Sequence, residues 1–196
     1  EGADRSLFNL APVLMFAVIL LVVAVIPVTE EFFLADLNIG LLYFLAITSL
    51  TTLAIFMAGW ASNNRYAMLG AMRAVAQLIS YEVPVILSLA SVVLLTGSLS
   101  LINIVENQDV PYLLVLPLTF LVFLIGSSAE LNRTPFDIAE AESEIIAGYH
   151  TEYSGMKFGL FQLAEFASVL VTSAIGVTLF LQGWRWAVLP SPIWFL

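Results

Sequence analysis

The residues best suited to chemistry in this chain are carboxylates gathered in one short stretch of its second half. Thr134, Pro135 and Asp137 predict a helix start, with a capping hydroxyl, a proline in the first turn and an acid beside the unpaired N–H groups. Gly148 predicts the end of this helix. The acids between these two signals are Asp137, Glu140, Glu142 and Glu144. Asp137, Glu140 and Glu144 share one face, where like charges repel, so the pattern fits either a solvated acidic face or groups that exchange protons.

Further acids, Glu82, Glu130 and Glu165, fall at or inside apolar stretches. Glu165 stands about ten residues past Gly155, or ~15 Å along a helix that rises 1.5 Å per residue. A central ionisable group in a membrane helix costs at least ~2.5 kcal/mol and is a functional-site hypothesis, although a neutral acid hydrogen-bonded to a neighbouring helix would serve structure alone. Burial and like-charge neighbours both favour the protonated carboxyl group, so acids running from a loop into a span predict a proton path. The spacing does not demonstrate converging oxygens, and no metal ligand is assigned.

The composition places these acids in a membrane protein. Of the 196 residues, 61% are hydrophobic and 11% are charged, whereas soluble domains are about 45–50% apolar and about 25% charged. Five stretches reach the ~20 residues that a membrane-spanning helix needs, roughly 7–28, 37–61, 83–102, 113–129 and 158–182. Alternating strand patterns are missing, so we expect an all-α polytopic transmembrane helix bundle that forms a single membrane domain over 1–196.

The basic residues orient this bundle under the positive-inside rule. Arg5, Arg65, Arg73, Arg133 and Lys157 precede the first span or lie in the loops 62–82 and 130–157, and Arg185 is the exception. We therefore expect those two loops in the cytoplasm.

The loop 62–82 carries apolar residues at helical spacing. Met68, Met72, Val75 and Ile79 recur at i, i+4, i+7 and i+11. This pattern predicts an amphipathic helix that lies on the membrane surface. The alternative is a helix that covers a cavity, with Arg73 reaching inward to a carboxylate.

The composition also argues against several kinds of site. With no cysteine and His150 as the single histidine, the chain lacks the ligands of a thiolate-bound iron–sulfur cluster, a structural zinc or a bis-histidine haem, so any redox cofactor must belong to a partner. The 6 Lys and Arg are scattered against 15 acids, which leaves a net charge of −9 and no basic surface for nucleic acid. The chain starts without Met and stops inside an apolar run, and we expect it to be a piece of a longer polypeptide.

Several segments together resemble a known family. They are Gly2-Ala-Asp-Arg5, Gly59-Trp-Ala-Ser-Asn-Asn-Arg-Tyr66 leading to Ser80-Tyr-Glu82, Glu130-Leu-Asn-Arg-Thr-Pro-Phe-Asp137 with the Glu140, Glu142 and Glu144 cluster, and Gly148-Tyr-His-Thr-Glu-Tyr-Ser-Gly-Met-Lys-Phe158. In this order, over nearly the whole chain, they resemble the quinone-chamber membrane subunit of NADH–quinone oxidoreductase (respiratory complex I), a family with bacterial and mitochondrial members. The chain is similar to helices two to six of the family's eight.

The resemblance implies a role in respiratory electron transport and proton translocation. The family's subunit forms the membrane half of the quinone chamber, so the chain would act as a subunit of an oxidoreductase and translocase. Quinone, such as ubiquinone, would be the substrate, whereas NADH, FMN and iron–sulfur clusters would be bound by partner subunits and no cofactor by this chain. The expected partners are the peripheral-arm iron–sulfur and quinone-site subunits, other membrane-arm subunits and the lipid of a bacterial cytoplasmic membrane.

The resemblance also implies roles for individual residues. The carboxylates that match the family's link between quinone site and proton path are Glu82, Glu130, Glu140, Glu142, Glu144, Glu152 and Glu165. Those expected at or near the quinone channel are Arg133, Asp137, Phe158 and Phe161. The family's direct proton donors to quinone sit on the peripheral arm, so no residue here is expected to be catalytic in the bond-making sense. One departure is Ala139, where the family usually has proline in Phe-Asp-Leu-Pro-Glu.

Other functions fit parts of the same pattern. A near relative would be the equivalent subunit of a membrane-bound hydrogenase or of a ferredoxin- or F420-linked complex, in which the acidic loop couples to a different donor. A stand-alone proton or cation transporter would use the acids as its ion path without a peripheral partner. A passive anchor for a peripheral enzyme would make the acid in the fifth span dispensable.

Overall fold

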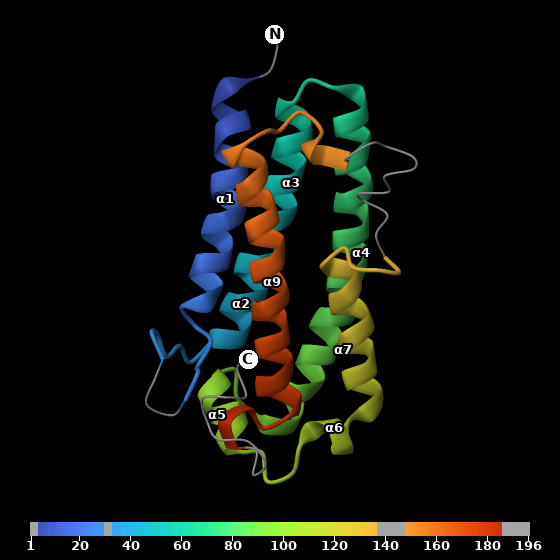
Figure 1. Ribbon diagram of the computed structural model, residues 1–196. Coiled ribbons are helices and arrows are strands. Elements are labelled where there is room, and N and C mark those ends of the chain that lie inside the picture. Colours follow the sequence, from blue (N-terminus) through green and yellow to red (C-terminus); the bar gives the residue numbers. More distant parts are fainter. Residues whose placement is uncertain (1–3, 30–32, 137–147, 186–196) are drawn as a thin grey trace.

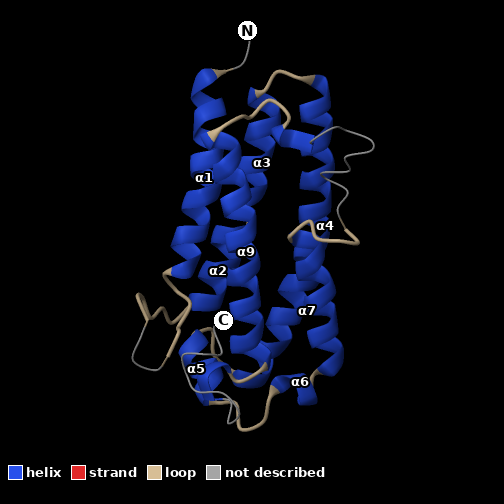
Figure 2. Ribbon diagram, viewed as in Figure 1, coloured by secondary structure: helices blue, strands red, loops and turns tan. Residues whose placement is uncertain are grey.

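The computed structural model describes residues 4–29, 33–136 and 148–185. Within these ranges every regular element is a helix (Figure 2). The elements are α1 (Arg5–Val23), α2 (Gly40–Thr48), α3 (Leu50–Ala61), α4 (Arg65–Thr96), α5 (Leu101–Glu106), α6 (Tyr112–Val115), α7 (Pro117–Glu130), η1 (Gly148–His150), α9 (Met156–Phe180) and η2 (Gly183–Arg185). The all-α bundle expected from the sequence is confirmed.

The long apolar helices of the bundle correspond to the apolar stretches of the sequence. In the described chain, α1, the pair α2 and α3, α4 and α9 are each long and apolar enough to cross a membrane, and α7 is a shorter apolar helix. Their buried side chains form a continuous core that includes Leu41, Leu89, Phe161 and Ile175. The bundle is therefore arranged as a membrane domain, with apolar side chains both inside it and on its outer surface.

Three of the basic residues lie at one end of the bundle. Figure 1 shows the start of α1, the connection from α3 to α4 and the start of α9 at one end of the bundle, with α5, α6 and η2 at the other. Arg5 and Arg65 are the first residues of α1 and α4, and Lys157 is in the first turn of α9. We call this the basic end, and its cytoplasmic placement under the positive-inside rule stays a prediction.

The segment 62–82 differs from its expected form, because no separate surface helix exists there. Residues 65–82 are the first half of α4, which continues without interruption for 32 residues, or about 48 Å at 1.5 Å per residue. The Met and Ile stripe does not mark the packed face, since Met72 and Ile79 are 52% and 54% exposed. The packed face consists of small residues, Ala67, Gly70, Ala71 and Ala74, which let α3 and η1 approach closely.

The helix α7 is too short to cross a bilayer. It begins at Pro117, a residue suited to a first turn, and covers 14 residues, or about 21 Å, against a hydrocarbon core of ~30 Å. Asn132 ends the helical path with a φ of 50°, in the left-handed region. Figure 1 shows that α7 rises beside the second half of α4 and stops near the middle of the bundle. The loop 131–136 therefore lies near the middle of the length of α4 and not at an end of the bundle, with Arg133, Thr134 and Pro135 exposed.

Candidate functional site

Two of the predicted carboxylates meet in one internal cavity at the depth where α7 ends. The cavity has a volume of about 60 Å³, which exceeds the ~10–15 Å³ that one water molecule requires. Its polar lining consists of Glu130, Glu165, Asn132, Thr48, Thr51, Ser168 and Thr172, and its apolar lining of Met15, Ile19, Ile55, Leu78 and Leu131. We call it the carboxylate cavity. Its carboxylates and hydroxyl groups can hold a short chain of hydrogen-bonded water.

Glu82 extends this group along α4. The hydroxyl group of Ser49, at the break between α2 and α3, donates to its Oε1 atom. Glu82 also lies close enough to Glu130 for their charges to interact. Glu82, Glu130 and Glu165, which are far apart in the sequence, are thus brought into one region of the bundle by α4, α7 and α9.

Glu165 has a further partner near the basic end of the bundle. The hydroxyl group of Tyr149, in η1, donates to Glu165 Oε1 at 2.8 Å. The Tyr149 side chain is fully buried and its ring contacts those of His150 and Phe161 edge to face. A side chain of η1 thereby reaches an acid inside α9.

The short helix η1 is held in place by backbone packing against α4. A Cβ atom on Gly70 would lie 2.9 Å from both the Cα and the carbonyl carbon of Gly148. No side chain fits between two backbones at this distance. The glycine at position 70 is therefore what allows η1, and with it Tyr149, to approach the bundle.

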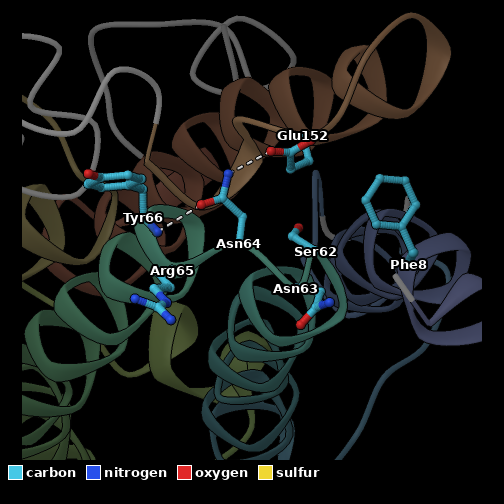
Figure 3. Close-up of a pocket in the computed structure, with 7 residues that line it drawn as sticks. All are labelled: Phe8, Ser62, Asn63, Asn64, Arg65, Tyr66 and Glu152. Carbon is cyan, nitrogen blue, oxygen red and sulfur yellow. Dashed lines mark hydrogen bonds between the residues drawn. The ribbon is translucent and has the colours of Figure 1, made fainter. Parts of the chain in front are cut away.

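Glu152 lies in a different place from the other described acids. Its Oε1 accepts a hydrogen bond from Asn64 Nδ2 at 2.6 Å, while Asn64 Oδ1 accepts one from the backbone N–H of Tyr66 at 2.9 Å and caps α4 (Figure 3). These residues line an open pocket of about 460 Å³ at the basic end. The structure does not bring Glu152 into the carboxylate cavity.

The described residues expected near a quinone channel have distinct surroundings. The Arg133 guanidinium lies 5.0 Å from the centre of the Phe166 ring, at the rim of a groove of about 350 Å³ between α7 and α9. Phe158 is 37% exposed and contacts the His150 ring. Phe161 is completely buried between Tyr149 and Tyr153, so Phe158 presents a surface and Phe161 supports the packing behind it.

The comparison with known proteins decides the family. The family model for NADH dehydrogenase matches residues 1–196. The chain belongs to the NADH dehydrogenase family. The family resemblance expected from the motifs is confirmed.

Relatives within this family carry a more specific name, the H subunit of NADH-quinone oxidoreductase. The chain is 58% identical over 194 residues to the relative of this name from Dehalococcoides mccartyi strain CBDB1, an alignment that covers 99% of this chain and 55% of the relative. It is 50% identical over 200 residues to the relative from Geobacillus sp. strain WCH70, covering 100% of this chain and 60% of the relative. The chain thus spans a little more than half the length of these curated relatives.

In this member of the NADH dehydrogenase family, part of the predicted site lies outside the described residues. Asp137, Glu140, Glu142 and Glu144 all fall there. Both flanks of this acidic segment are described, and both contact α4. Phe136 packs against Tyr81, with ring centres 5.4 Å apart, and Gly148 packs against Gly70.

Two polar residues near the carboxylates, Gln77 and Tyr149, make contacts that the sequence does not predict. A signal for Gln77 exists, because it continues the small-residue face of α4 at Ala67, Gly70 and Ala74, where a buried amide must find partners. No comparable pattern in the sequence points to Tyr149.

Proposed function

We propose that this chain is the quinone-chamber and energy-coupling membrane subunit of a proton-translocating NADH–quinone oxidoreductase. The family and the names of the relatives support the assignment. The observation that carries it is the cavity shared by Glu130 and Glu165, with Glu82 beside them. Partner subunits would bind NADH, FMN and iron–sulfur clusters, since this chain has no cysteine.

The carboxylates serve as proton-holding stations in this proposal. Glu130 and Glu82 lie close enough for their charges to interact, and two ionised carboxylates at such a site repel each other, so that pair favours sharing one proton. Water between Glu165 and Glu130, assisted by the hydroxyl groups of Thr48 and Thr51, provides the path between them. Glu82, with its Ser49 partner, receives or releases the proton further along α4.

The reduction of quinone influences this proton path through the segments that flank residues 137–147. Arg133 belongs to the loop after α7, Asp137 follows it in the sequence, and Phe158 offers an exposed ring at the start of α9. A change of charge on quinone near this loop alters the electrostatic energy of Glu130, which begins it. Through Tyr149, a displacement of η1 alters the hydrogen bond to Glu165.

The first prediction concerns the two acids of the cavity. In the full-length subunit within the assembled complex, Glu165→Gln and Glu130→Gln remove a protonatable group while keeping size and polarity. We expect quinone-linked proton pumping to fall at least about tenfold, at the scale usual for an essential proton-transfer group. NADH oxidation by an artificial acceptor should stay unchanged, because it bypasses quinone.

The matched control is Glu106→Gln, which changes an exposed acid on α5, a helix that contributes no residue to the lining of the carboxylate cavity. Pumping by this control should equal that of the parent complex. Normal pumping in both cavity variants would contradict the proposed proton path.

A further inference from the structure

The loop 131–136 poses a problem of hydrogen bonding that one side chain of α4 solves. Backbone outside a helix at membrane depth is tolerated only where its polar groups find partners in protein or water. Within the loop, the N–H groups of Arg133 and Phe136 find acceptors in Ser128 and Arg133. The carbonyl oxygen of Ala129 also accepts the N–H of Asn132 at 3.2 Å, and further donors to this oxygen and to that of Phe136 come from a side chain of α4.

Gln77 supplies these donors from a buried position. Its Nε2 atom lies 2.7 Å from the carbonyl oxygen of Ala129, before the loop, and 2.7 Å from that of Phe136, at its end. The Asn132 Oδ1 atom is a third acceptor at 3.2 Å. The Gln77 side chain is only 7% exposed, so water does not compete freely for these contacts.

The orientation of this amide follows from its surroundings. Three oxygen acceptors face one end of the side chain, so turning the amide over would point its own oxygen at them. Gln77 Oε1 consequently has no hydrogen-bond partner among the atoms of the described residues. This orientation keeps the amide donor directed at the loop.

We infer that Gln77 is a positioning residue, whose amide ties both ends of the loop 131–136 to α4 and thereby sets the places of Glu130 and Arg133. This inference rests on the proposed function, because it assigns to that loop a part in quinone-linked proton transfer. Glu130 follows Ala129 directly, and Arg133 lies between the two tethered carbonyl groups. Gln77 itself touches neither substrate nor the transferred proton.

The test compares two substitutions in the full-length subunit within the assembled complex. Gln77→Glu keeps the length and shape of the side chain but replaces the donor group by oxygen, which repels the two carbonyl groups. Gln77→Met keeps similar volume and removes all polarity. If donation matters, Gln77→Glu is at least as harmful as Gln77→Met; if only packing matters, Gln77→Glu behaves like the parent.

Two measurements read the result. Hydrogen–deuterium exchange of a peptide covering 129–136 should become faster in Gln77→Glu, by between about twofold and tenfold for each hydrogen bond lost. The KM for quinone should rise by a similar factor and more than kcat falls, while NADH oxidation by an artificial acceptor is unchanged. Ser80→Ala is the control, because the exposed Ser80 hydroxyl on α4 bonds to Ala76 in its own helix.

The outcomes separate this inference from the proposed function. Parent-like exchange and KM in Gln77→Glu would overturn the inference. Faster exchange with unchanged quinone kinetics would also overturn it, because the loop would be held by Gln77 without serving the reaction. Normal pumping in the Glu130 and Glu165 variants would instead overturn the proposed function, and the exchange measurement would still report on the tether.

Discussion

Tyr149 joins the short helix η1 to an acid inside α9 through a single hydroxyl group. The 2.8 Å hydrogen bond to Glu165 Oε1 is made by a fully buried side chain, so its geometry is fixed by packing. A donor to the ionised form of a buried carboxylate stabilises that form. At the scale of residues, the hydrogen bond to Glu165 therefore depends on where η1 lies, and so would the proton-holding role given to Glu165 in the proposed function.

Tyr149→Phe tests this dependence by removing only the hydroxyl group. We expect a modest loss of stability, about 1–3 kcal/mol for a hydrogen bond to a charged group, and a severalfold loss of quinone-linked proton pumping. The control is Tyr153→Phe, which removes a hydroxyl group from the same aromatic cluster and leaves the Tyr149–Glu165 hydrogen bond in place. Equal pumping by Tyr149→Phe and the parent complex would exclude a role for the hydroxyl group.

His150 makes the same segment sensitive to acid. Burial lowers the pKa of this imidazole below its ordinary value, so the folded chain holds it neutral at neutral pH. The imidazole binds a proton more readily in the unfolded segment than in the folded one. The free energy of unfolding is therefore greatest above the unfolded pKa of about 6.5 and decreases as the pH falls below it. The intrinsic chemical rate of amide exchange slows as the pH falls through this range, so we expect exchange in 148–155 to slow less than that rate requires, and His150→Leu to restore the full slowing.

At the scale of elements, the contact between α4 and η1 depends on the glycine at position 70, whose lack of a side chain lets the two backbones touch. Gly70→Ala places a Cβ atom 2.9 Å from Gly148 backbone atoms, so one of the two elements must move. We expect a loss of about 1–3 kcal/mol, typical of overpacking, and a displaced Tyr149 with impaired pumping. Thermal unfolding of the purified subunit or of its complex measures the first effect.

Gly159→Ala is the matched substitution for this test. Gly159 lies in α9, and an added Cβ would meet none of the described atoms within 4 Å. Because alanine favours helix over glycine by up to about 1 kcal/mol, this variant should be neutral or slightly more stable. A parent-like Gly70→Ala variant would show that η1 adapts without cost.

The sequence predicts the apolar helices well, because composition alone distinguishes them from loops. It does not predict that α4 continues through 65–82, since charged and polar residues there lower the hydropathy that marks a span. The direction of its packed face is also not evident from the apolar stripe. Large apolar residues such as Met72 face outward in a membrane protein, and small ones such as Ala71 face the neighbouring helix.

The acids of the site can be named from the sequence, but their grouping cannot. Glu165 stands out because it interrupts an apolar helix, and Glu82 and Glu130 because they lie at the ends of apolar stretches. Glu130 and Glu165 share a cavity because α7 ends early beside α9. No local sequence pattern predicts where α7 ends relative to α9. Gln77 and Tyr149 are found only when the three-dimensional contacts are known.

At the scale of the whole molecule, three acids lie further along the bundle than the basic residues of its basic end. Arg5, Arg65 and Lys157 lie at the basic end of the bundle, whereas Glu82, Glu130 and Glu165 lie further along it. The net charge of −9 is therefore not a uniform property of the surface. Carboxylates placed inside a membrane domain are costly unless they are protonated or hydrated, which suits groups whose charge changes during a reaction cycle.

In the proposed function, the early end of α7 would also bear on the electrical work of moving a proton. Moving one charge across the whole potential is worth ~2.3 kcal/mol per 100 mV, in proportion to the fraction of the field crossed. If water reached Glu165 and Glu130 from the basic end, most of the potential would fall across the protein between those acids and the opposite end. That insulating layer would be thinner than the whole bundle. In the proposed function, a proton would reach Glu165 at little electrical cost, and most of the work against the membrane potential would be done beyond Glu82.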